Sequence, residues 1–424
     1  MGTTESALIV SAKAAAARKA SRSLIAAGDE ERTRVLLAIA DALLANSERI
    51  LTENGIDMFR AKSSGMAQSM QDRLLLTEQR IADMAGGLRQ VAALPNPLGR
   101  TINERTLPNG LQLTQRSVPF GVVGMVYEAR PNVTVDAAAI LVKSGNAALL
   151  RGSSSAEASN EVLVAIMRET LAQSSISEDA IQIIPSDDRS TVNALLHARG
   201  EVDLVIPRGS ASLIRMVVDE ATVPTIETGA GVCHVYVDVD ADLEKALPIL
   251  INSKTHRPSV CNAAETLLVH EAVAEKFLPV AMKALVEAGV ILHVDARAAA
   301  IAGDLGISAE LATNESWSTE YNALEMNIAV VSDVVAAADH IQNFGTNHTE
   351  AIVTENQATA DTFIALSDSA AIMINASTRF TDGEQMGFGA EIGISNQKLH
   401  ARGPMGLEQM TTTTWIVRGN GQIR

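Results

Sequence analysis

Apolar residues follow different spacings in successive parts of the chain, and each spacing predicts a different kind of structure. From Thr4 to about Leu94 they recur every three to four positions, which predicts helices, and Pro95 and Pro97 end this region. Residues 101–118 are rich in turn formers and β-formers and predict a hairpin or an arm. The chain therefore begins with a helical region that a short β segment follows.

Beyond Pro119, short apolar runs alternate with segments of helix length. The β-like runs in this part of the chain are GVVGMVYE, AALLRG, IQIIP, DLVIP and TIET. Four or five such runs separated by helix-length segments are typical of a parallel sheet with crossover helices. Sheets of this kind bind ligands at the carboxyl ends of their strands. We therefore expect a ligand-binding α/β unit in this region.

A second series of β-like and helical segments begins near Val235 and ends with the run AAIMIN, which predicts a second α/β unit. The tail from Gly403, which ends in TTTTWIVRG, predicts an exposed strand. An exposed strand needs a partner, and both the arm near residue 110 and another subunit remain open as that partner. The patterns together predict the α/β class.

Length and charge restrict the classes of partner. A chain of 424 residues suggests two or three domains. The aromatic content of 3% disfavours nucleic-acid recognition by base stacking, and the net charge of −16 opposes non-specific binding to nucleic acid or to an anionic membrane. No apolar run approaches the ~20 residues of a membrane helix. We therefore expect neither a nucleic-acid nor a membrane partner, and an anionic substrate would need local basic residues.

The chain contains two cysteines, Cys233 and Cys261. Two are too few for a disulfide framework and fit a reducing compartment, so we expect a cytoplasmic protein. Neither cysteine belongs to a CxxC pair, which disfavours a zinc site. The alanine-rich, basic stretch 11–23 resembles a transit peptide, but its helical pattern continues without a break into Leu36 and beyond.

Cys261 has a basic sequence context. Lys254, His256 and Arg257 precede it by a few positions, and cations close to a thiol favour the nucleophilic thiolate. The same cluster could hold an anionic substrate. Cys261 as a small buried packing residue remains the alternative. Cys233 begins a β-like run, and we interpret it as a packing residue.

Two turns after β-like runs have the composition of phosphate-binding turns. They are the segments 151–155 (RGSSS) and 208–212 (RGSAS). A turn that opens a helix offers free backbone N–H groups to a phosphate, and an arginine there pairs with a ribose 2′-phosphate. The GxGxxG fingerprint is absent, and an ordinary surface turn with an arginine is the alternative. His340 and His348 lack carboxylates at ligand spacing, so we expect no metal site.

The stretches around these residues resemble a known superfamily. Those that carry the resemblance are VPFGVVGMVYEARPNVTVDAAA, LVKSGNAALLRG, DLVIPRGSASLI, GVCHVYVD, KTHRPSVCNAAETLLVH, NFGTNHTEAIVT, and NASTRFTDGEQMGFGAEIGIS followed by QKLHARGPMGLE. Across essentially the whole chain, the sequence resembles the aldehyde dehydrogenase superfamily and, within it, the reductases that act on gamma-glutamyl phosphate.

The resemblance implies an aldehyde-dehydrogenase-like α/β fold with two α/β domains and a small β arm used for oligomerisation. The cofactor-binding domain would span residues 1–230, with 101–118 as part of the arm. The catalytic domain would span 231–383. Residues 384–424 would return to the cofactor domain and complete the arm.

The resemblance also implies a reaction, the NADPH-dependent reduction of L-glutamyl 5-phosphate to L-glutamate 5-semialdehyde and phosphate, on the route to proline. The Cys261 thiolate would attack the acyl phosphate and expel phosphate, and hydride transfer from NADPH would reduce the resulting thioester. Asn132 matches the asparagine that the superfamily uses in its oxyanion hole, together with the backbone N–H of Cys261.

The cofactor residues implied by the resemblance lie in the two glycine-containing turns. Arg151 falls where the superfamily carries a lysine on the adenosine ribose, which fits a 2′-phosphate and NADPH. Arg208 precedes Gly209 and Ser210, which match the start of the superfamily's phosphate turn. The second glycine of that turn is missing here, so the position of the pyrophosphate stays open.

Three residues are candidates for binding the carboxylate or phosphate of the substrate: His256, Arg257 and Arg379. Glu227 falls where hydrolytic members carry a general-base glutamate, but phosphate release needs no activated water. A catalytic and a structural role for Glu227 are both open.

Two alternatives differ in the class of function. One is an NAD-dependent semialdehyde dehydrogenase that produces a free acid, and the other is a non-catalytic metabolite-binding protein. We expect a homo-oligomer acting on a small-molecule substrate, with possible functional coupling to glutamate 5-kinase.

Overall fold

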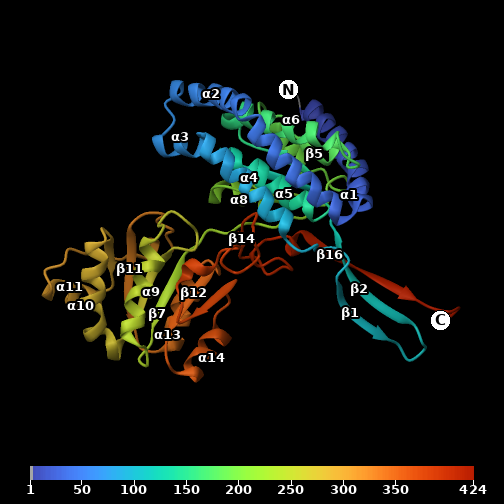
Figure 1. The fold of residues 1–424 in the computed structure, drawn as a ribbon. Coiled ribbons are helices and arrows are strands. Elements are labelled where there is room, and N and C mark those ends of the chain that lie inside the picture. The colour runs from blue at the N-terminus through green and yellow to red at the C-terminus, as the bar shows by residue number, and fades with distance from the viewer. Residues whose placement is uncertain (1–2) are drawn as a thin grey trace. The chain divides into compact units, whose positions relative to one another are not determined.

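The computed structural model describes residues 3–424, which fold as two units (Figure 1). Unit 1 comprises Met1–Thr228, Gly387–Gly393 and Met405–Arg424, with residues 1 and 2 outside the described part. Unit 2 comprises Gly229–Met386 and Ile394–Pro404. The expected first domain, residues 1–230, thus begins with two residues outside the described part and extends slightly beyond the end of the first segment of unit 1.

The segment 394–404 differs from the expectation that all of 384–424 returns to the first domain. Its two short strands, β14 (Ile394–Ser395) and β15 (Gly403–Pro404), pair with each other. The backbone N–H of Gly229, the first residue of unit 2, donates to the carbonyl of Ile394. This contact attaches the hairpin to unit 2.

Unit 1 begins with the predicted helical region. Its helices are α1 (Thr3–Ala45), α2 (Ser47–Ser63), α3 (Gln68–Leu74) and α4 (Glu78–Ala93). Helix α1 contains a kink at Gly28, whose φ of 76° lies in the left-handed region that favours glycine. Helix α4 ends just before Pro95, as the sequence predicts. Helix α1 packs against α4, and both bury their apolar faces.

The sheet of unit 1 is parallel and has the strand order β5-β4-β3-β6. Its strands are β3 (Val122–Tyr127), β4 (Ala147–Arg151), β5 (Ile181–Ile183) and β6 (Leu204–Arg208). The crossover helices are α5 (Pro131–Lys143), α6 (Glu157–Leu171) and α7 (Ser190–Leu196), and α8 (Ala211–Glu220) follows the last strand. The predicted parallel sheet is confirmed, but the run TIET is not a strand, because Thr225 forms only an isolated bridge with Val205.

An antiparallel sheet of three strands forms the arm. Its strands are β1 (Thr101–Thr106), β2 (Gln112–Pro119) and β16 (Thr411–Arg418), in the order β1-β2-β16. Strand β16 pairs with β2 from Thr411 opposite Pro119 to Arg418 opposite Gln112. Of the two partners left open for the terminal strand, the arm near residue 110 is therefore its partner within the chain.

Unit 2 contains a parallel sheet of seven strands with the order β10-β9-β11-β8-β7-β12-β13. The strands are β7 (Cys233–Val237), β8 (Ala264–His270), β9 (Ile291–Val294), β10 (Glu310–Leu311), β11 (Glu325–Val331), β12 (Thr349–Val353) and β13 (Ala371–Ile374). The helices are α9 (Leu243–Thr255), α10 (Glu271–Glu287), α11 (Ala296–Asp304), α12 (Asn314–Trp317), α13 (Val334–Phe344) and α14 (Gln357–Leu366). The predicted second α/β unit is confirmed.

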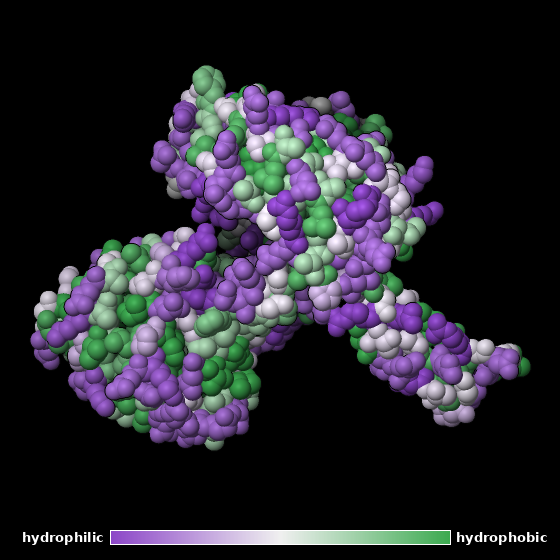
Figure 2. Space-filling view, in the orientation of Figure 1, coloured by the Kyte–Doolittle hydropathy of each residue, from purple (hydrophilic) through white to green (hydrophobic). Residues whose placement is uncertain are grey.

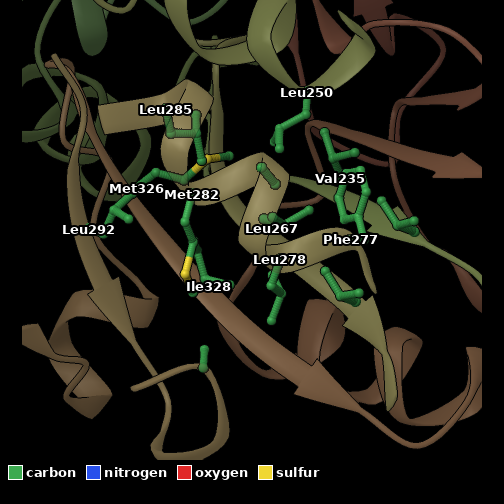
Figure 3. Packing of buried hydrophobic residues seen from close by; sticks show 14 of the residues in the cluster. Val235, Leu250, Leu267, Phe277, Leu278, Met282, Leu285, Leu292, Met326 and Ile328 are labelled. Carbon is green, nitrogen blue, oxygen red and sulfur yellow. The ribbon is translucent and has the colours of Figure 1, made fainter. Parts of the chain in front are cut away.

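The core of unit 2 lies between this sheet and the helices that pack on it. Figure 3 shows Leu267, Phe277, Met282 and Ile328 within one cluster of buried side chains. Figure 2 shows hydrophilic residues spread over the visible face of each unit. No helix between residues 3 and 424 combines the length and apolarity that a bilayer crossing requires.

Candidate active site

Cys261 lies in the loop between α9 and β8, three residues before β8 begins. It is therefore at the amino edge of the unit 2 sheet, and it is partly exposed. This exposure differs from the full burial that the packing alternative requires. Cys233, at the start of the neighbouring strand β7, is fully buried, and burial raises the pKa of its thiol.

The backbone before β7 holds the peptide of Cys261 closely. A Cβ atom on Gly231 would lie 1.5 Å from the Cys261 carbonyl oxygen, so only glycine fits this position. The Cys233 thiol donates to the same carbonyl oxygen at 3.2 Å. The backbone N–H of Gly231 donates to Glu320 Oε1 at 2.9 Å, which fixes Gly231 in turn. The peptide of Cys261 is thus positioned by Gly231 and Cys233, and Glu320 acts on it through Gly231.

The loop after β13 brings an arginine into the electrostatic reach of Cys261. Asn262 Nδ2 donates to the carbonyl oxygen of Thr381 at 2.8 Å, next to the short 3₁₀ helix that carries Arg379. Burial lowers the pKa of Arg379. The charges of Asp382 and Cys261 raise this pKa, and the charge of Arg257 lowers it. The structure therefore groups Cys261 with two of the predicted substrate-binding residues, Arg257 and Arg379.

The sequence suggests that Lys254 belongs to this group of cations, but the structure places it elsewhere. Its Nζ donates to Glu265 Oε2 at 2.6 Å, and both side chains are fully buried. Burial lowers the pKa of Lys254, and burial raises the pKa of Glu265 to about 7. Because its ammonium group is buried and paired with Glu265, Lys254 is not placed to hold an anionic substrate. His256 and Arg257 are exposed.

Glu265 was missed by the sequence reasoning. The available signal was a carboxylate inside the apolar run AETLLVH, since a charge in a buried strand requires a partner.

The turn 208–212, which the sequence predicts to bind phosphate, lies where the strand order of unit 1 changes direction. Strand β3 has β4 and β5 on one side and β6 on the other, and ligands of such sheets bind at this point, beyond the carboxyl ends. Arg208 ends β6, and Ser210 caps α8 by accepting from the N–H of Leu213. Ser210 Oγ also donates to Glu128 Oε1 at 2.6 Å.

Gly209 lies close to the side chain of Glu128 in this turn. A Cβ on Gly209 would lie 2.7 Å from the carboxyl carbon of Glu128. Glu128 directly follows β3, and sequence reasoning gave it no role. The turn thus brings together Arg208, Gly209 and Ser210, as expected, with an additional carboxylate.

Arg151, at the carboxyl end of β4, is 7% exposed. Its Nη1 donates to the carbonyl of Gly152 at 2.8 Å, and its Nη2 to the carbonyls of Ser186 at 3.3 Å and Asp188 at 3.1 Å. Burial lowers its pKa. The guanidinium therefore ties the end of β4 to the loop after β5, and a contact with a phosphate would require an exchange of these bonds.

Asn132 is the second residue of α5 and is exposed. Its side-chain amide donates to Asp136 Oδ2 at 3.1 Å. The sequence reasoning proposed Asn132 but did not consider Asp136, although the spacing of four residues on a helix was the available signal. Glu227 is partly exposed near the end of the first segment of unit 1.

A second feature of unit 2 is a recess that lies away from Cys261. This shallow recess, lined by Asp240, Glu355 and Asn356, follows β7 and β12, at the opposite edge of the sheet from Cys261. Within residues 3–424, no group of three or more histidine, cysteine, aspartate or glutamate side chains is arranged to hold a metal ion.

A sequence model of the aldehyde dehydrogenase family matches residues 4–299. The match, together with the two α/β units, shows that the chain belongs to this family. A gamma-glutamyl phosphate reductase of Moorella thermoacetica is 53% identical over 418 residues, covering 99% of each chain. One of Kineococcus radiotolerans is 53% identical over 408 residues, covering 96% of this chain and 94% of its own.

A crystal structure of a gamma-glutamyl phosphate reductase of Thermotoga maritima superposes with a TM-score of 0.94 and 44% identity, covering 97% of this chain and 99% of that one. Within the aldehyde dehydrogenase family, the chain therefore belongs to the gamma-glutamyl phosphate reductases.

Proposed function

We propose that the protein reduces L-glutamyl 5-phosphate to L-glutamate 5-semialdehyde and phosphate with NADPH, through a thioester on Cys261. The observation that carries this proposal is the loop before β8, where a partly exposed thiol interacts electrostatically with Arg379, which in turn interacts with Arg257. The names of the similar proteins give the substrate. The route to proline follows from the semialdehyde product.

The arginines account for the first half of the reaction. The substrate carries carboxylate and phosphate charges, which the guanidinium groups of Arg257 and Arg379 attract in a chain of net charge −16. The Cys261 sulfur attacks the acyl carbon, the bond to the phosphate oxygen breaks, and phosphate leaves. His256, exposed beside Arg257, is a further contact for the anion.

The oxyanion of the attacked carbonyl needs hydrogen-bond donors. We assign this role to the side-chain amide of Asn132 and the backbone N–H of Cys261. The contacts of Gly231 and Cys233 with the Cys261 carbonyl support a fixed peptide. A fixed donor requires no reorganisation when charge develops in the transition state.

Unit 1 fits a dinucleotide at its phosphate turn. Gly209 lies close to the Glu128 side chain, and the first turn of α8 offers backbone N–H groups. Arg208 and Ser210 complete this binding site, and Arg151 is the candidate for the 2′-phosphate. Bound NADPH supplies the hydride that reduces the thioester. Glu227 has no step in this scheme, because phosphate rather than water takes part.

The assembly and location belong to the same proposal. We place the protein in the cytoplasm as a homo-oligomer joined through the arm, without nucleic-acid or membrane partners. We also propose functional coupling to glutamate 5-kinase, because an acyl phosphate is labile.

The reverse reaction tests the proposal. Purified protein should reduce NADP with glutamate semialdehyde only when phosphate is present, and Cys261→Ala should lose turnover while it still binds NADPH. Turnover without phosphate, with a free acid as product, would identify a hydrolytic semialdehyde dehydrogenase instead. Binding of metabolites with no turnover under either condition would identify a non-catalytic protein.

A further inference from the structure

Asn132 and Asp136 lie one turn apart on α5, so their side chains share a face of the helix. The amide nitrogen of Asn132 donates to Asp136 Oδ2 at 3.1 Å. Asn132 is exposed, whereas Asp136 is only partly exposed. An ionised carboxylate accepts hydrogen bonds and donates none, so this contact requires the nitrogen of the amide, not its oxygen, on the Asp136 side.

The carboxyl group of Asp136 lies close to α4. A Cβ on Gly87 of that helix would be 3.8 Å from Asp136 Oδ1, an ordinary van der Waals distance. Burial raises the pKa of Asp136 to about 6, while the Asn132 hydrogen bond and the charge of Arg208 lower it. The hydrogen bond from Asn132 also reaches a charged acceptor whenever Asp136 is ionised, and bonds to charged groups are stronger than bonds between neutral groups.

We infer that Asp136 is a positioning residue that orients the Asn132 amide toward the oxyanion of the reaction. The amide nitrogen carries two hydrogens. Asp136 accepts one, which leaves the other directed away from the carboxylate, on an exposed side chain. Without this acceptor the amide rotates freely and also presents its own oxygen, which repels the oxyanion. The inference rests on the proposed function, because it requires an oxyanion.

Leucine at position 136 has a similar size and accepts no hydrogen bond. Asp136→Leu should lower kcat by about 10-fold to 100-fold, the range of one charge-assisted hydrogen bond, with KM little changed. The matched variant Asp136→Asn keeps an acceptor oxygen on the same stem. Its kcat should stay within about threefold of the wild type, since only the charge of the acceptor is lost.

A double-mutant cycle separates orientation from a general structural effect. Asn132→Ala should lower kcat by ~100-fold to 1000-fold. Adding Asp136→Leu to Asn132→Ala should cause no further loss, because the amide to be oriented is gone. An equal loss in both backgrounds would overturn the inference, as would a wild-type kcat for Asp136→Leu.

Folding and the proposed function have separate controls. Circular dichroism and thermal unfolding report whether Asp136→Leu folds, and Asp136→Ala replaces it in the cycle if it does not. Cys261→Ala is measured in the same phosphate-dependent assay. Activity of Cys261→Ala would refute the proposed function itself. Loss of activity in Cys261→Ala together with additive effects at positions 132 and 136 would refute only the role of Asp136.

Discussion

At the scale of single residues, the contact between Gly231 and Cys261 decides where the sulfur is held. The two residues precede the adjacent strands β7 and β8, and their backbones meet without space for a side chain. A group that attacks a carbonyl must lie within a fraction of an ångström of its productive position. Gly231 therefore matters for chemistry although it carries no reactive atom.

We expect Gly231→Ala to lower kcat by at least about 100-fold, the usual cost of displacing a reacting group by about 1 Å. The added methyl carbon would overlap the Cys261 carbonyl oxygen, so the peptide must move. The matched control is Gly303→Ala on α11, where a Cβ meets nothing within 4 Å. Steady-state kinetics of the two variants provide the measurement. Wild-type kcat for Gly231→Ala would show that the position of this peptide is unimportant.

Sequence reasoning at this scale used local signals. Cys261, Arg257 and Arg379 were proposed from residue type and neighbours along the chain, and their roles remain predictions. Lys254 was assigned to the same group because spacing alone does not show which way a helical side chain points; its partner Glu265 lies on β8. The role of Gly231 depends on the pairing of two strands, which local sequence does not contain.

At the scale of elements, the helix and strand runs were predicted, but the strand order was not. The alternation of runs follows from hydrophobic periodicity, whereas the order β10-β9-β11-β8-β7-β12-β13 depends on contacts between distant segments. The run TIET shows a further limit. A β-like composition forms a strand only where a neighbour is available, and Thr225 has only an isolated bridge.

The beginning of β12 gives unit 2 a defined pH dependence. His348, next to this strand, is fully buried, and burial lowers its pKa to about 4 from the usual 6.5. The folded state therefore keeps the imidazole neutral while the unfolded chain binds a proton below pH 6.5. The resulting stability is present above pH 6.5 and is lost as the pH falls toward 4.

We expect His348 to contribute up to ~1.4 kcal/mol per pH unit to the fall in unfolding free energy over this interval. In His348→Gln, which does not titrate, this part of the slope should disappear. Urea denaturation at pH 5 and pH 7, followed by circular dichroism, provides the comparison. Equal slopes for the variant and the wild type would contradict the burial of a neutral imidazole.

At the scale of the whole molecule, the arm is the part whose purpose the single chain does not explain. Strands β1 and β16 form the edges of its sheet, and exposed edges attract other strands. Trp415 is 46% exposed and Val417 is 55% exposed. Because these two residues of β16 are two positions apart, their side chains lie on the same face. We therefore propose this surface as the contact between copies of the chain.

Charging that face should weaken the assembly. We expect the double variant Trp415→Asp and Val417→Asp to shift the mass in solution toward the monomer, since two carboxylates cannot be buried in an apolar contact without loss. Multi-angle light scattering measures the mass, and circular dichroism checks that the units stay folded. An unchanged oligomer would place the interface elsewhere.

The central claim is that the acyl group passes through Cys261 and that phosphate, not water, releases it. The most direct measurement follows NADPH formation after the enzyme is mixed with glutamate semialdehyde and NADP in the absence of phosphate. Peptide mass spectrometry then locates the acyl adduct. The account predicts a burst of about one NADPH per active site, an acyl adduct on the peptide that contains Cys261, and steady turnover once phosphate is added. Steady turnover without phosphate, or an adduct on another residue, would contradict it.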